Sequence, residues 1–470
     1  MEQETRVSKA AWLTSERTRD YVTVWTIVLL MSGQGFRYLM GLPAYAVLSV
    51  VTVAAVAATM RTRIRDLRIP VLLAAFLGLA VASVVWSATR TVTALAIVVL
   101  LVTTYLALAT VRRTSPARFL ELLYRGLQVS LFGGVAFEVI VALVVRHPIA
   151  PLVGDLVKIA DDDLGKTGIM WSHDMLLSGG PIDGFVGNRN PFGAIALFAA
   201  IAGVALLMER RIRAIDGLVT LAMAGVVHAL TQSATVTVTA VYIGLLAMAA
   251  LAIRRVPLRA KKAFSFTVLA FTAIAAVLTI KFRAEIFAMV DRSSDATNRT
   301  EIWRQVISVA EQRPEGWGFV GYWPIWEQPY AGILDKVGLV ATHSHNAFLD
   351  SWLQLGLIGL GLLLGLLVLA FGSAWRLVER AGHGDTFIPL GWAMLTAALA
   401  LQALTESRLL VEGGWFLLVA LYCSAPQVFI LTIIDPEFVH SATRRSEAEA
   451  DRAAAAATAL AQHNAVNSKQ

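Results

Sequence analysis

The sequence predicts an all-α membrane protein that crosses the bilayer about twelve times. Of its 470 residues, 57% are hydrophobic and only 16% are charged, whereas soluble domains average about 45–50% and about 25%. Apolar stretches of about 17–25 residues recur along the chain, and each is long enough to span a bilayer as a helix. These observations exclude a string of soluble domains, which the length alone would suggest.

The apolar stretches alternate with polar links, so each predicted span can be bounded from the sequence. The fifth stretch carries charge within it, at Arg125 and Glu138. The polar run at 12–20 and the many spans behind it argue against a cleavable signal peptide. The predicted spans are 20–36, 42–60, 69–87, 92–111, 119–145, 191–208, 217–231, 234–252, 263–280, 346–371, 386–404 and 413–434.

Lys and Arg residues collect in the connections on one side of these spans. Because basic loops stay in the cytoplasm, that side and both termini are predicted to be cytoplasmic. The chain then divides into an N-terminus at 1–19, a membrane domain at 20–434 and a polar cytoplasmic tail at 435–470. Two long loops, near 146–190 and 281–345, lie on the outer side. The basic connections are 61–68, 112–118, 210–213, 254–262 and 376–380.

Cysteine and charge content exclude several classes of function. The single cysteine, Cys423, excludes intramolecular disulfides and Cys-rich metal sites. The formal net charge of +7 fits basic loops beside anionic lipids or phosphates. The sequence contains no pattern typical of nucleic-acid binding and no phosphate-binding P-loop, so we expect neither nucleic-acid partners nor ATP-driven transport.

Long loops outside a membrane usually carry function, and the second one contains a predicted amphipathic helix near 297–312. Asn298 or Thr300 can cap it, and Arg299 and Trp303 are one turn apart on one face. Arg299 is therefore expected at the start of a short helix near the membrane surface. The apolar face of this helix consists of Ile302, Val306 and Val309.

The same loop ends in the run Thr342-His-Ser-His-Asn346, directly before the most apolar span. Ser344 or Asn346 can cap the helix of that span, which puts His345 at the positive helix end. A helix N-terminus disfavours the imidazolium, so His345 is predicted to be neutral at physiological pH and able to accept a proton. The alternative is that His345 is only a polar residue at the helix cap.

Between these two features lies the run Glu315-Gly-Trp-Gly-Phe-Val-Gly-Tyr-Trp323, which predicts a tight turn with bulky side chains. Trp317, Trp323 and Trp326 can stack on sugar rings, although such aromatics more often lie at the membrane interface.

The first long loop ends with Arg189 and Asn190 at the mouth of the sixth span. An arginine there either anchors the helix in the interface or meets an anionic partner such as a phosphate. His173 and Asp174 can form an acid–base pair, whereas the acidic run at 161–163 is typical of a solvated loop segment.

Several of these runs resemble the signature region of the bacterial O-antigen ligase and O-antigen polymerase superfamily. The matching residues are Gly187-Asn-Arg-Asn190, Arg299, Trp303, Gly316-Trp-Gly318, His345-Asn346, Leu349 and Leu355-Gly-Leu-Ile-Gly-Leu360. The detailed likeness covers about 184–200 and 297–360. The twelve-span layout and the long outer loop are similar as well.

This resemblance implies a GT-C-like, metal-independent glycosyltransferase without a cofactor. Such an enzyme passes a glycan from undecaprenyl pyrophosphate to a sugar hydroxyl of a glycan or glycolipid acceptor, with inversion, at the outer face of the bacterial cytoplasmic membrane. By the same resemblance, His345 is the base for the acceptor hydroxyl, and Arg299 and Arg189 hold the pyrophosphate. One departure is Ser233-Ala234, where many members have a Ser-Arg pair.

The residue types support the same chemistry independently of the likeness. A departing pyrophosphate needs its charge neutralised by a metal or by fixed cations, and the loops offer arginines. Glu406 and Arg408, at the end of the eleventh span, either pair with each other or line the cavity. Further candidates for the site are His343, Asn346, Trp303, Asn190, Glu406 and Arg408.

Alternative functions remain open at this point. A polymerase of lipid-linked repeat units breaks the same bond as a ligase and differs in its acceptor. A transporter or lipid flippase would carry ionisable residues deep within its spans, and this sequence has few. A metallohydrolase would use His343 and His345 as ligands, but the sequence suggests no third ligand.

Overall fold

The computed structural model describes residues 15–62, 67, 69–153, 170–281, 293–338, 341–382 and 385–424, without the side chains of 258, 275, 276, 279, 280 and 293–298. The chain divides into two units, at 1–428 and 429–470, and every described residue belongs to the first. The acidic run at 161–163 and the predicted tail at 435–470 lie outside the described residues.

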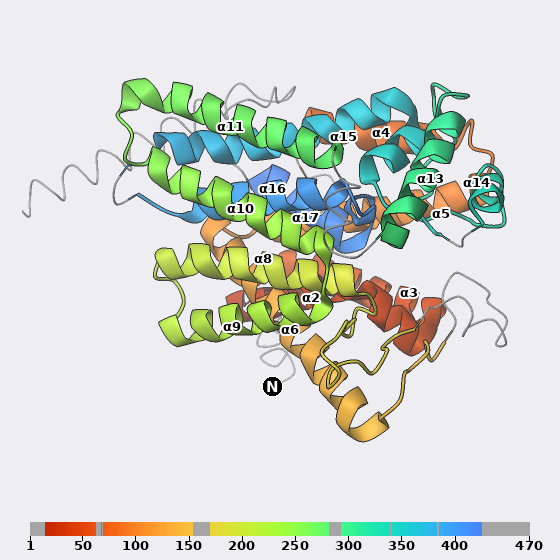
Figure 1. Cartoon of the computed structure of the whole chain (residues 1–470), viewed down its shortest axis with the longest axis horizontal. Coiled ribbons are helices and arrows are strands. Elements are labelled where there is room, and N and C mark those ends of the chain that lie inside the picture. The colour runs from red at the N-terminus through yellow and green to blue at the C-terminus, as the bar shows by residue number, and fades with distance from the viewer. Residues whose placement is uncertain are drawn as a thin grey trace, which may run out of the picture. The chain divides into compact units, whose positions relative to one another are not determined.

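The described residues form an all-helical protein in which the one β contact is an isolated bridge between Ile149 and Ser172 (Figure 1). Most helices are long and apolar, as in a polytopic membrane protein, which confirms the predicted fold class. The helices are α2 Glu16–Met31, α3 Gly33–Met60, α4 Val71–Ala82, α5 Arg90–Arg112, α6 Pro116–Ile140 with the π turn Val141–Val145, α8 Arg189–Met208, α9 Ala214–Thr231, α10 Ala234–Ile253, α11 Leu258–Lys281, α13 Ser293–Ala310, α14 Tyr330–Val337, α15 Ala347–Arg380, α16 Ile388–Ala403 and α17 Glu412–Ser424.

A helix lies at each of the twelve predicted spans, but the number twelve stays a prediction. Among the described residues, 7 helices are long and apolar enough to cross a membrane: α3, α5, α6 with its π turn, α8, α9, α10 and α15. Two shorter apolar helices, α4 and α16, add to these. The last predicted span continues to 434, and its part beyond Ser424 is outside the described residues.

The first two predicted spans, 20–36 and 42–60, leave an outer link at 37–41, and the bounds of this link are wrong. The chain breaks already after α2, at Ser32, and the next helical turns run on to a kink at Gly41. Gly41 has φ 77°, a conformation that glycine adopts without strain. Arg37 therefore lies within helical turns near this end of α3 and not in an open loop.

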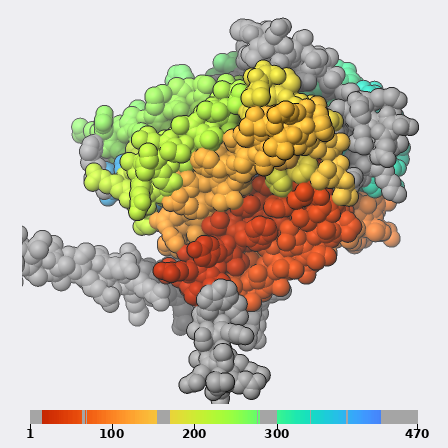
Figure 2. Space-filling model, turned by 90° about the horizontal axis from the view of Figure 1, so that it is seen from below, coloured from red at the N-terminus to blue at the C-terminus, as the bar shows by residue number. Residues whose placement is uncertain are grey.

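Close packing between the helices depends on small residues. A Cβ atom on Gly126 of α6 would lie 2.5 Å from Ile27 of α2, and one on Gly134 would lie 2.4 Å from Phe192 of α8. Both pairs are buried, so these glycines allow α6 to approach two helices at once. In Figure 2 the red N-terminal helices α2 and α3 share one face with the orange α6, and α2 packs against both α3 and α6.

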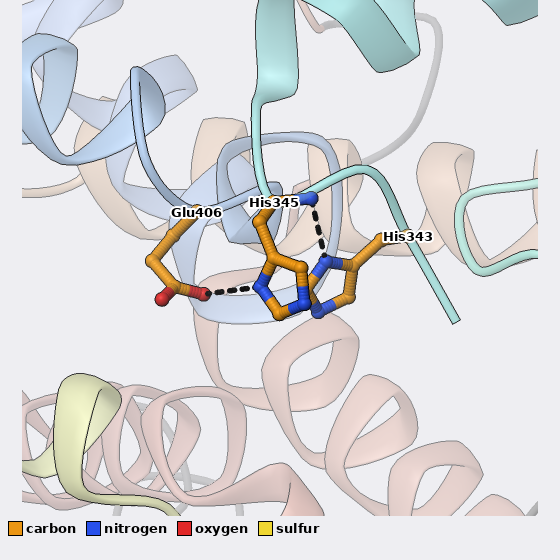
Figure 3. Close-up of side chains that lie close together, drawn as sticks. All are labelled: His343, His345 and Glu406. Carbon is orange, nitrogen blue, oxygen red and sulfur yellow. Dashed lines mark hydrogen bonds and ion pairs between the residues drawn. The ribbon is translucent and has the colours of Figure 1, made fainter. Parts of the chain in front are cut away.

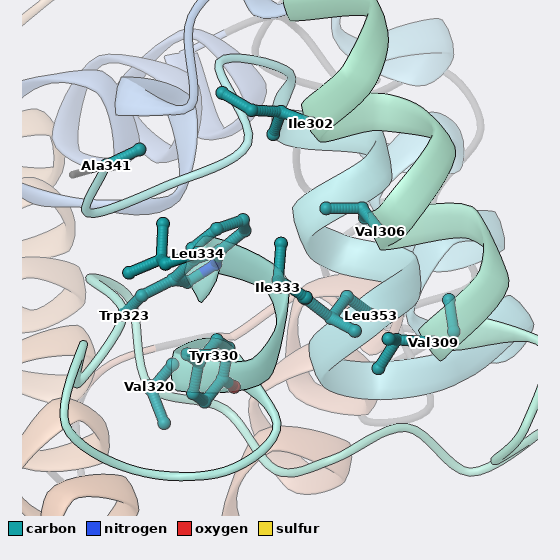
Figure 4. Packing of buried hydrophobic residues seen from close by; sticks show 11 residues of the cluster. Ile302, Val306, Val309, Val320, Trp323, Tyr330, Ile333, Leu334, Ala341 and Leu353 are labelled. Atoms are coloured by element: carbon teal, nitrogen blue, oxygen red, sulfur yellow. The ribbon is translucent and has the colours of Figure 1, made fainter. Parts of the chain in front are cut away.

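The second long loop has a hydrophobic core of its own, which we call the α13–α14 cluster. It joins the apolar face of α13 to α14 and to the first turns of α15 (Figure 4). Its buried residues are Ile302, Val306, Val309, Ala310, Val320, Trp323, Tyr330, Ile333, Leu334, Ala341 and Leu353. The apolar spacing in α13 is thus confirmed, whereas the predicted caps at Asn298 and Thr300 are wrong because the helix begins at Ser293.

Trp323 is not an interfacial residue, because it is 3% exposed and its Nε1 donates to Asp350 Oδ1 at 2.8 Å within this cluster. The loop is also bonded to α15 where that helix kinks at Gly356 (φ 66°). The kink exposes backbone acceptors of α15: Trp317 N–H donates to Leu353 O and Gly318 N–H to Gln354 O, each at 2.9 Å. The loop and the first turns of α15 therefore form one packed segment.

Candidate functional site

Polar residues from both long loops line a single cavity of about 1450 Å³. Ligand pockets usually measure about 300–1,000 Å³, so this one suits a large substrate. Its polar lining includes Arg37, His173, Asp183, Arg189, His343, His345, Glu406, Arg408 and Glu412. Its apolar lining comes largely from α3 and α5, and includes Leu42, Val50, Val53, Leu95, Val99 and Val102.

His345 lies in a turn that hydrogen bonds from three directions hold in place. Trp303 Nε1 donates to Ser344 O at 2.9 Å, which ties the turn to α13. Asn346 caps α15 by accepting from Phe348 N and Leu349 N, and its own N–H donates to Ser407 Oγ at 3.0 Å. The capping expected of Asn346 is therefore confirmed, and Trp303 supports the turn from outside the cavity lining.

The imidazole of His345 lies between His343 and Glu406 (Figure 3). The two rings have centroids 4.2 Å apart, and His345 N–H donates to His343 Nδ1 at 3.1 Å. His345 Nδ1 lies 3.9 Å from Glu406 Oε2 and is buried without a hydrogen-bond partner among the described residues. The carboxylate is thus placed to stabilise a proton that the ring accepts.

Glu406, which lies just after α16, is held by groups from α8 and α13. Asn190 Nδ2 donates to Glu406 Oε1 at 2.8 Å, and Ser233 Oγ fixes Asn190 by donating to its Oδ1 at 2.8 Å. Arg299 donates to Thr405 O at 2.8 Å and lies 3.5 Å from Glu406 Oε1. Burial raises the pKa of Glu406, but His345 and Arg299 outweigh it, so the pKa of this carboxyl is lowered overall.

Arg299 differs from the sequence-based expectation in its place. It contacts Glu406 and Thr405 and is not among the residues that line the cavity. The pairing of Glu406 with Arg408 is also wrong, because Glu406 pairs with Arg299. Arg408 lies in a short 3-10 turn, Arg408–Leu410, and lines the cavity, and its side chain makes no hydrogen bond or ion pair with a described residue.

Arg189 and Arg37 are the other two arginines of the cavity lining. Arg189 is the first residue of α8, and its backbone N–H donates to Asp183 Oδ1 at 3.1 Å. Arg37 is 4% exposed, forms an ion pair with Glu412 and lies 5.9 Å from the ring centre of Tyr322. Sequence reasoning missed Arg37, although a lone charged residue between Asp20 and Arg61 is an unusual signal in an apolar region.

His343, His345 and Glu406 could hold a metal ion, since one ligand atom from each lies within 4.8 Å of the others. Glu406 is the third ligand that the sequence did not suggest. Two observations disfavour a divalent cation there. Glu406 already accepts from Asn190 and pairs with Arg299. Burial lowers the pKa of His343 most, and the guanidinium groups of Arg299 and Arg408 are close enough to lower it further, so these nearby positive charges would repel a metal ion.

The aromatic residues of the second loop serve different purposes. Trp317 Nε1 donates to Val309 O at 3.1 Å, and its ring packs under Arg313. Trp326 is 60% exposed and lines the cavity. Of the three tryptophans considered for sugar stacking, Trp326 therefore has the position for it.

In the first loop, His173 pairs with Asp183 and not with its sequence neighbour Asp174. The distance from His173 Nδ1 to Asp183 Oδ2 is 2.6 Å, and both residues line the cavity. The interpretation of His173 and Asp174 as a pair is therefore wrong. The true partner lies ten residues further on, across a turn that the sequence did not reveal.

Two comparisons with known proteins bear on this arrangement. Residues 217–364 match the family described as O-Antigen ligase. The exopolysaccharide production protein ExoQ of Rhizobium meliloti (strain 1021) is 32% identical over 265 residues, which cover 51% of this chain and 58% of that protein. The chain thus spans less than two thirds of the length of this relative. The family match includes Arg299 and His345, whereas Arg189 and Glu406 lie outside it.

Proposed function

We propose, from its likeness to the O-antigen ligase superfamily, that this multi-pass membrane protein transfers a glycan from undecaprenyl pyrophosphate to a sugar hydroxyl. The reaction takes place at the outer face of the bacterial cytoplasmic membrane, inverts the anomeric carbon and needs no metal. One observation carries the proposal: His345, beside the carboxylate of Glu406, shares a cavity with Arg189 and Arg408.

The acceptor hydroxyl must lose a proton as its oxygen attacks the anomeric carbon. His345 takes this proton, and Glu406 stabilises the imidazolium that results, because a carboxylate 3.9 Å away favours the charged ring. Arg299 and Asn190 hold Glu406 in position for this task. Arg299 thus acts through Glu406, which revises the direct pyrophosphate contact that the family likeness implies.

The departing diphosphate gains negative charge and needs fixed cations. Arg189 and Arg408 line the cavity and supply guanidinium groups, which match phosphate oxygens with paired donors. Arg408 suits this role because it has no ion-pair partner among the described residues. It also compensates for the arginine that many relatives have at the position of Ala234.

The polyprenyl chain of the donor requires an apolar surface next to these cations. Residues of α3 and α5 provide one in the lining of the same cavity. Three of them, Val50, Leu95 and Val99, are more than half exposed, as expected for side chains in contact with lipid. The donor would thus reach the site from within the membrane.

The test is glycan transfer in a deletion strain that carries variants of the gene. His345→Ala should lower transfer by at least about 100-fold while the protein remains folded and in the membrane. His147→Ala is the matched control, because His147 is exposed and does not line the cavity. Unchanged glycan attachment in the His345→Ala strain would refute the base assignment.

The same strain separates a ligase from a polymerase. Mass spectrometry of the undecaprenyl-linked material should reveal full-length, unattached chains if the enzyme is a ligase. Single repeat units would instead identify a polymerase. Substrate uptake by proteoliposomes without a covalent product would contradict both and favour a transporter.

A second candidate is a metal-assisted transferase or hydrolase, which the triad of His343, His345 and Glu406 favours. In that case the ion would replace the arginines as the group that neutralises the leaving phosphate. The neighbouring cations and the bonds already made by Glu406 argue for the metal-free reaction.

A further inference from the structure

We propose that His173, oriented by Asp183, is a second catalytic residue, which donates a proton to the departing diphosphate. This inference rests on the transfer reaction proposed above. It starts from a feature that neither the family match nor the family likeness covers, because His173 lies outside both 217–364 and the matching runs.

The geometry is that of an imidazole held by a carboxylate. His173 Nδ1 donates to Asp183 Oδ2 at 2.6 Å, so the neutral or charged ring keeps Nδ1 engaged and presents Nε2. The side chain of His173 is 43% exposed and that of Asp183 is 9% exposed, and both line the cavity. The carboxylate therefore lies behind the ring, and the ring faces the space in which the substrate would bind.

Asp183 is itself fixed at both of its oxygens and at its backbone. Its Oδ1 accepts from Arg189 N at 3.1 Å. Its backbone N–H donates to Glu138 Oε1 at 3.0 Å, and Gly184 N–H donates to the same oxygen at 2.7 Å. Ser172 Oγ donates to the other carboxylate oxygen, Glu138 Oε2, at 2.8 Å.

This network explains why the predicted fifth span carries an acidic residue. Glu138 is 1% exposed, and its carboxylate accepts three hydrogen bonds from the loop that carries His173 and Asp183. A buried charge in a membrane helix is costly and usually functional. Here the carboxylate of Glu138 fixes the position of the loop that carries His173 and Asp183 beside the cavity.

The position of this pair suits the leaving group and not the acceptor. Asp183 accepts from the backbone N–H of Arg189, so the pair lies at the start of α8, whose Arg189 lines the same cavity and is proposed above to hold the diphosphate. His345 comes from a different loop and is paired with Glu406. Two histidines, each hydrogen-bonded or close to a carboxylate, thus line one cavity. His345 can take the proton of the acceptor, and His173 can donate a proton to the leaving group.

The proton balance is complete with these two groups. The bond between the anomeric carbon and the diphosphate oxygen breaks as the acceptor oxygen forms its new bond to that carbon. The acceptor proton moves to His345, and a proton from the His173 imidazolium moves to the departing oxygen. Exchange with water then returns His173 to the charged form and His345 to the neutral form.

The experiment uses the full-length protein in lipid nanodiscs with a lipid-linked glycan donor. His173→Asn should lower kcat by about 100-fold and change the KM for the donor by less than about threefold, because the proton and not the binding is lost. Asp183→Asn should act in the same direction, since it removes the group that fixes the ring tautomer. His147→Asn is the control for an exposed histidine near the same loop.

A pH profile distinguishes catalysis from loop support. The charged groups about His173 are Asp183 and Arg189, and those about His345 are Glu406 and Arg299. A bell-shaped profile of kcat should lose its basic limb in His173→Asn and keep its acidic limb. His173→Gln serves as a second variant if the first does not fold.

Two results would overturn the inference: a kcat within about twofold of the wild type, or a loss confined to KM. Both leave the transfer reaction intact. Failure of the proposed function is different, because it would show as the absence of any transfer product from the wild-type protein or as full activity of His345→Ala.

Discussion

Glu406 connects the base and a cation of the candidate site, although it is distant from both in sequence. It lies 3.9 Å from His345 and 3.5 Å from Arg299, and Asn190 donates to it at 2.8 Å. A carboxylate with these contacts fixes the geometry of the ring and of the guanidinium together. Single variants at these positions are therefore expected to affect the same step.

We predict that Glu406→Gln lowers the transfer rate by about 100-fold or more, because the amide keeps the size of the side chain but loses the charge that stabilises imidazolium. The rate with a lipid-linked donor measures this. Glu327→Gln is the control, since Glu327 is an exposed carboxylate that is not in the cavity lining. A Glu406→Gln enzyme as fast as the control would show that His345 needs no carboxylate.

Removal of metal provides a second prediction for the same residues. Dialysis against EDTA should leave the transfer rate within about twofold, because Arg189 and Arg408 and not an ion neutralise the leaving group. Metal analysis of the dialysed, active protein completes the measurement. Loss of activity that zinc, magnesium or manganese restores would favour the metal centre of His343, His345 and Glu406.

At this scale the sequence predicted the residues of the loop better than their partners. His345, Arg299 and Trp303 are recognisable because they sit in a dense motif on one loop. Asp183 was not predicted, and Glu406 was a candidate whose partners the sequence did not reveal, because hydrogen bonds between loops depend on how the helices bring those loops together. Asn346 and Ser407, for example, are 61 residues apart and yet bonded.

At the scale of elements, the α13–α14 cluster positions the turn of His345. Trp303 projects from α13 to bond Ser344, and Arg299, one turn earlier, reaches Thr405 and Glu406. The helix was predictable from the spacing of Ile302, Val306 and Val309. Its start at Ser293 was not, because the polar residues ahead of this face have no apolar periodicity.

We predict that Ile333→Ala destabilises this segment by about 2–5 kcal/mol, the usual cost of truncating a fully buried aliphatic side chain. Ile333 is 0% exposed within the α13–α14 cluster. The expected result is a lower midpoint of thermal unfolding in detergent together with reduced transfer. Leu177→Ala, at a side chain that is 75% exposed, should change neither. Equal midpoints for the two variants would contradict a packed core in this loop.

At the scale of the whole molecule, hydropathy located the helices well, because burial in lipid leaves a strong and local signal. It could not separate 7 clear spans from the helices that are shorter or bear polar residues. It also could not foresee the break at Ser32 or the kink at Gly41, since glycine and serine are tolerated within membrane helices. The number of crossings and the orientation remain predictions.

Single cysteines test the predicted orientation. In a Cys423→Ser background, Leu177→Cys in the first long loop should react with a membrane-impermeant maleimide added to intact cells. Ala214→Cys, at the first residue of α9 and directly after the basic connection 210–213, should react only after the membrane is permeabilised, because basic loops remain in the cytoplasm. Both positions are exposed. The reverse pattern would invert the topology and with it the placement of the cavity.

The kink at Gly356 has a mechanical consequence. The first turns of α15, just after His345, are bonded to the loop through Trp317 and Gly318, and the remainder of the helix continues to Arg380 beyond the kink. We expect this remainder to tilt as bilayer thickness changes while the loop-bonded turns keep their register. The position of His345 in the cavity would then not depend on lipid composition, and the transfer rate would be similar in thin and thick membranes.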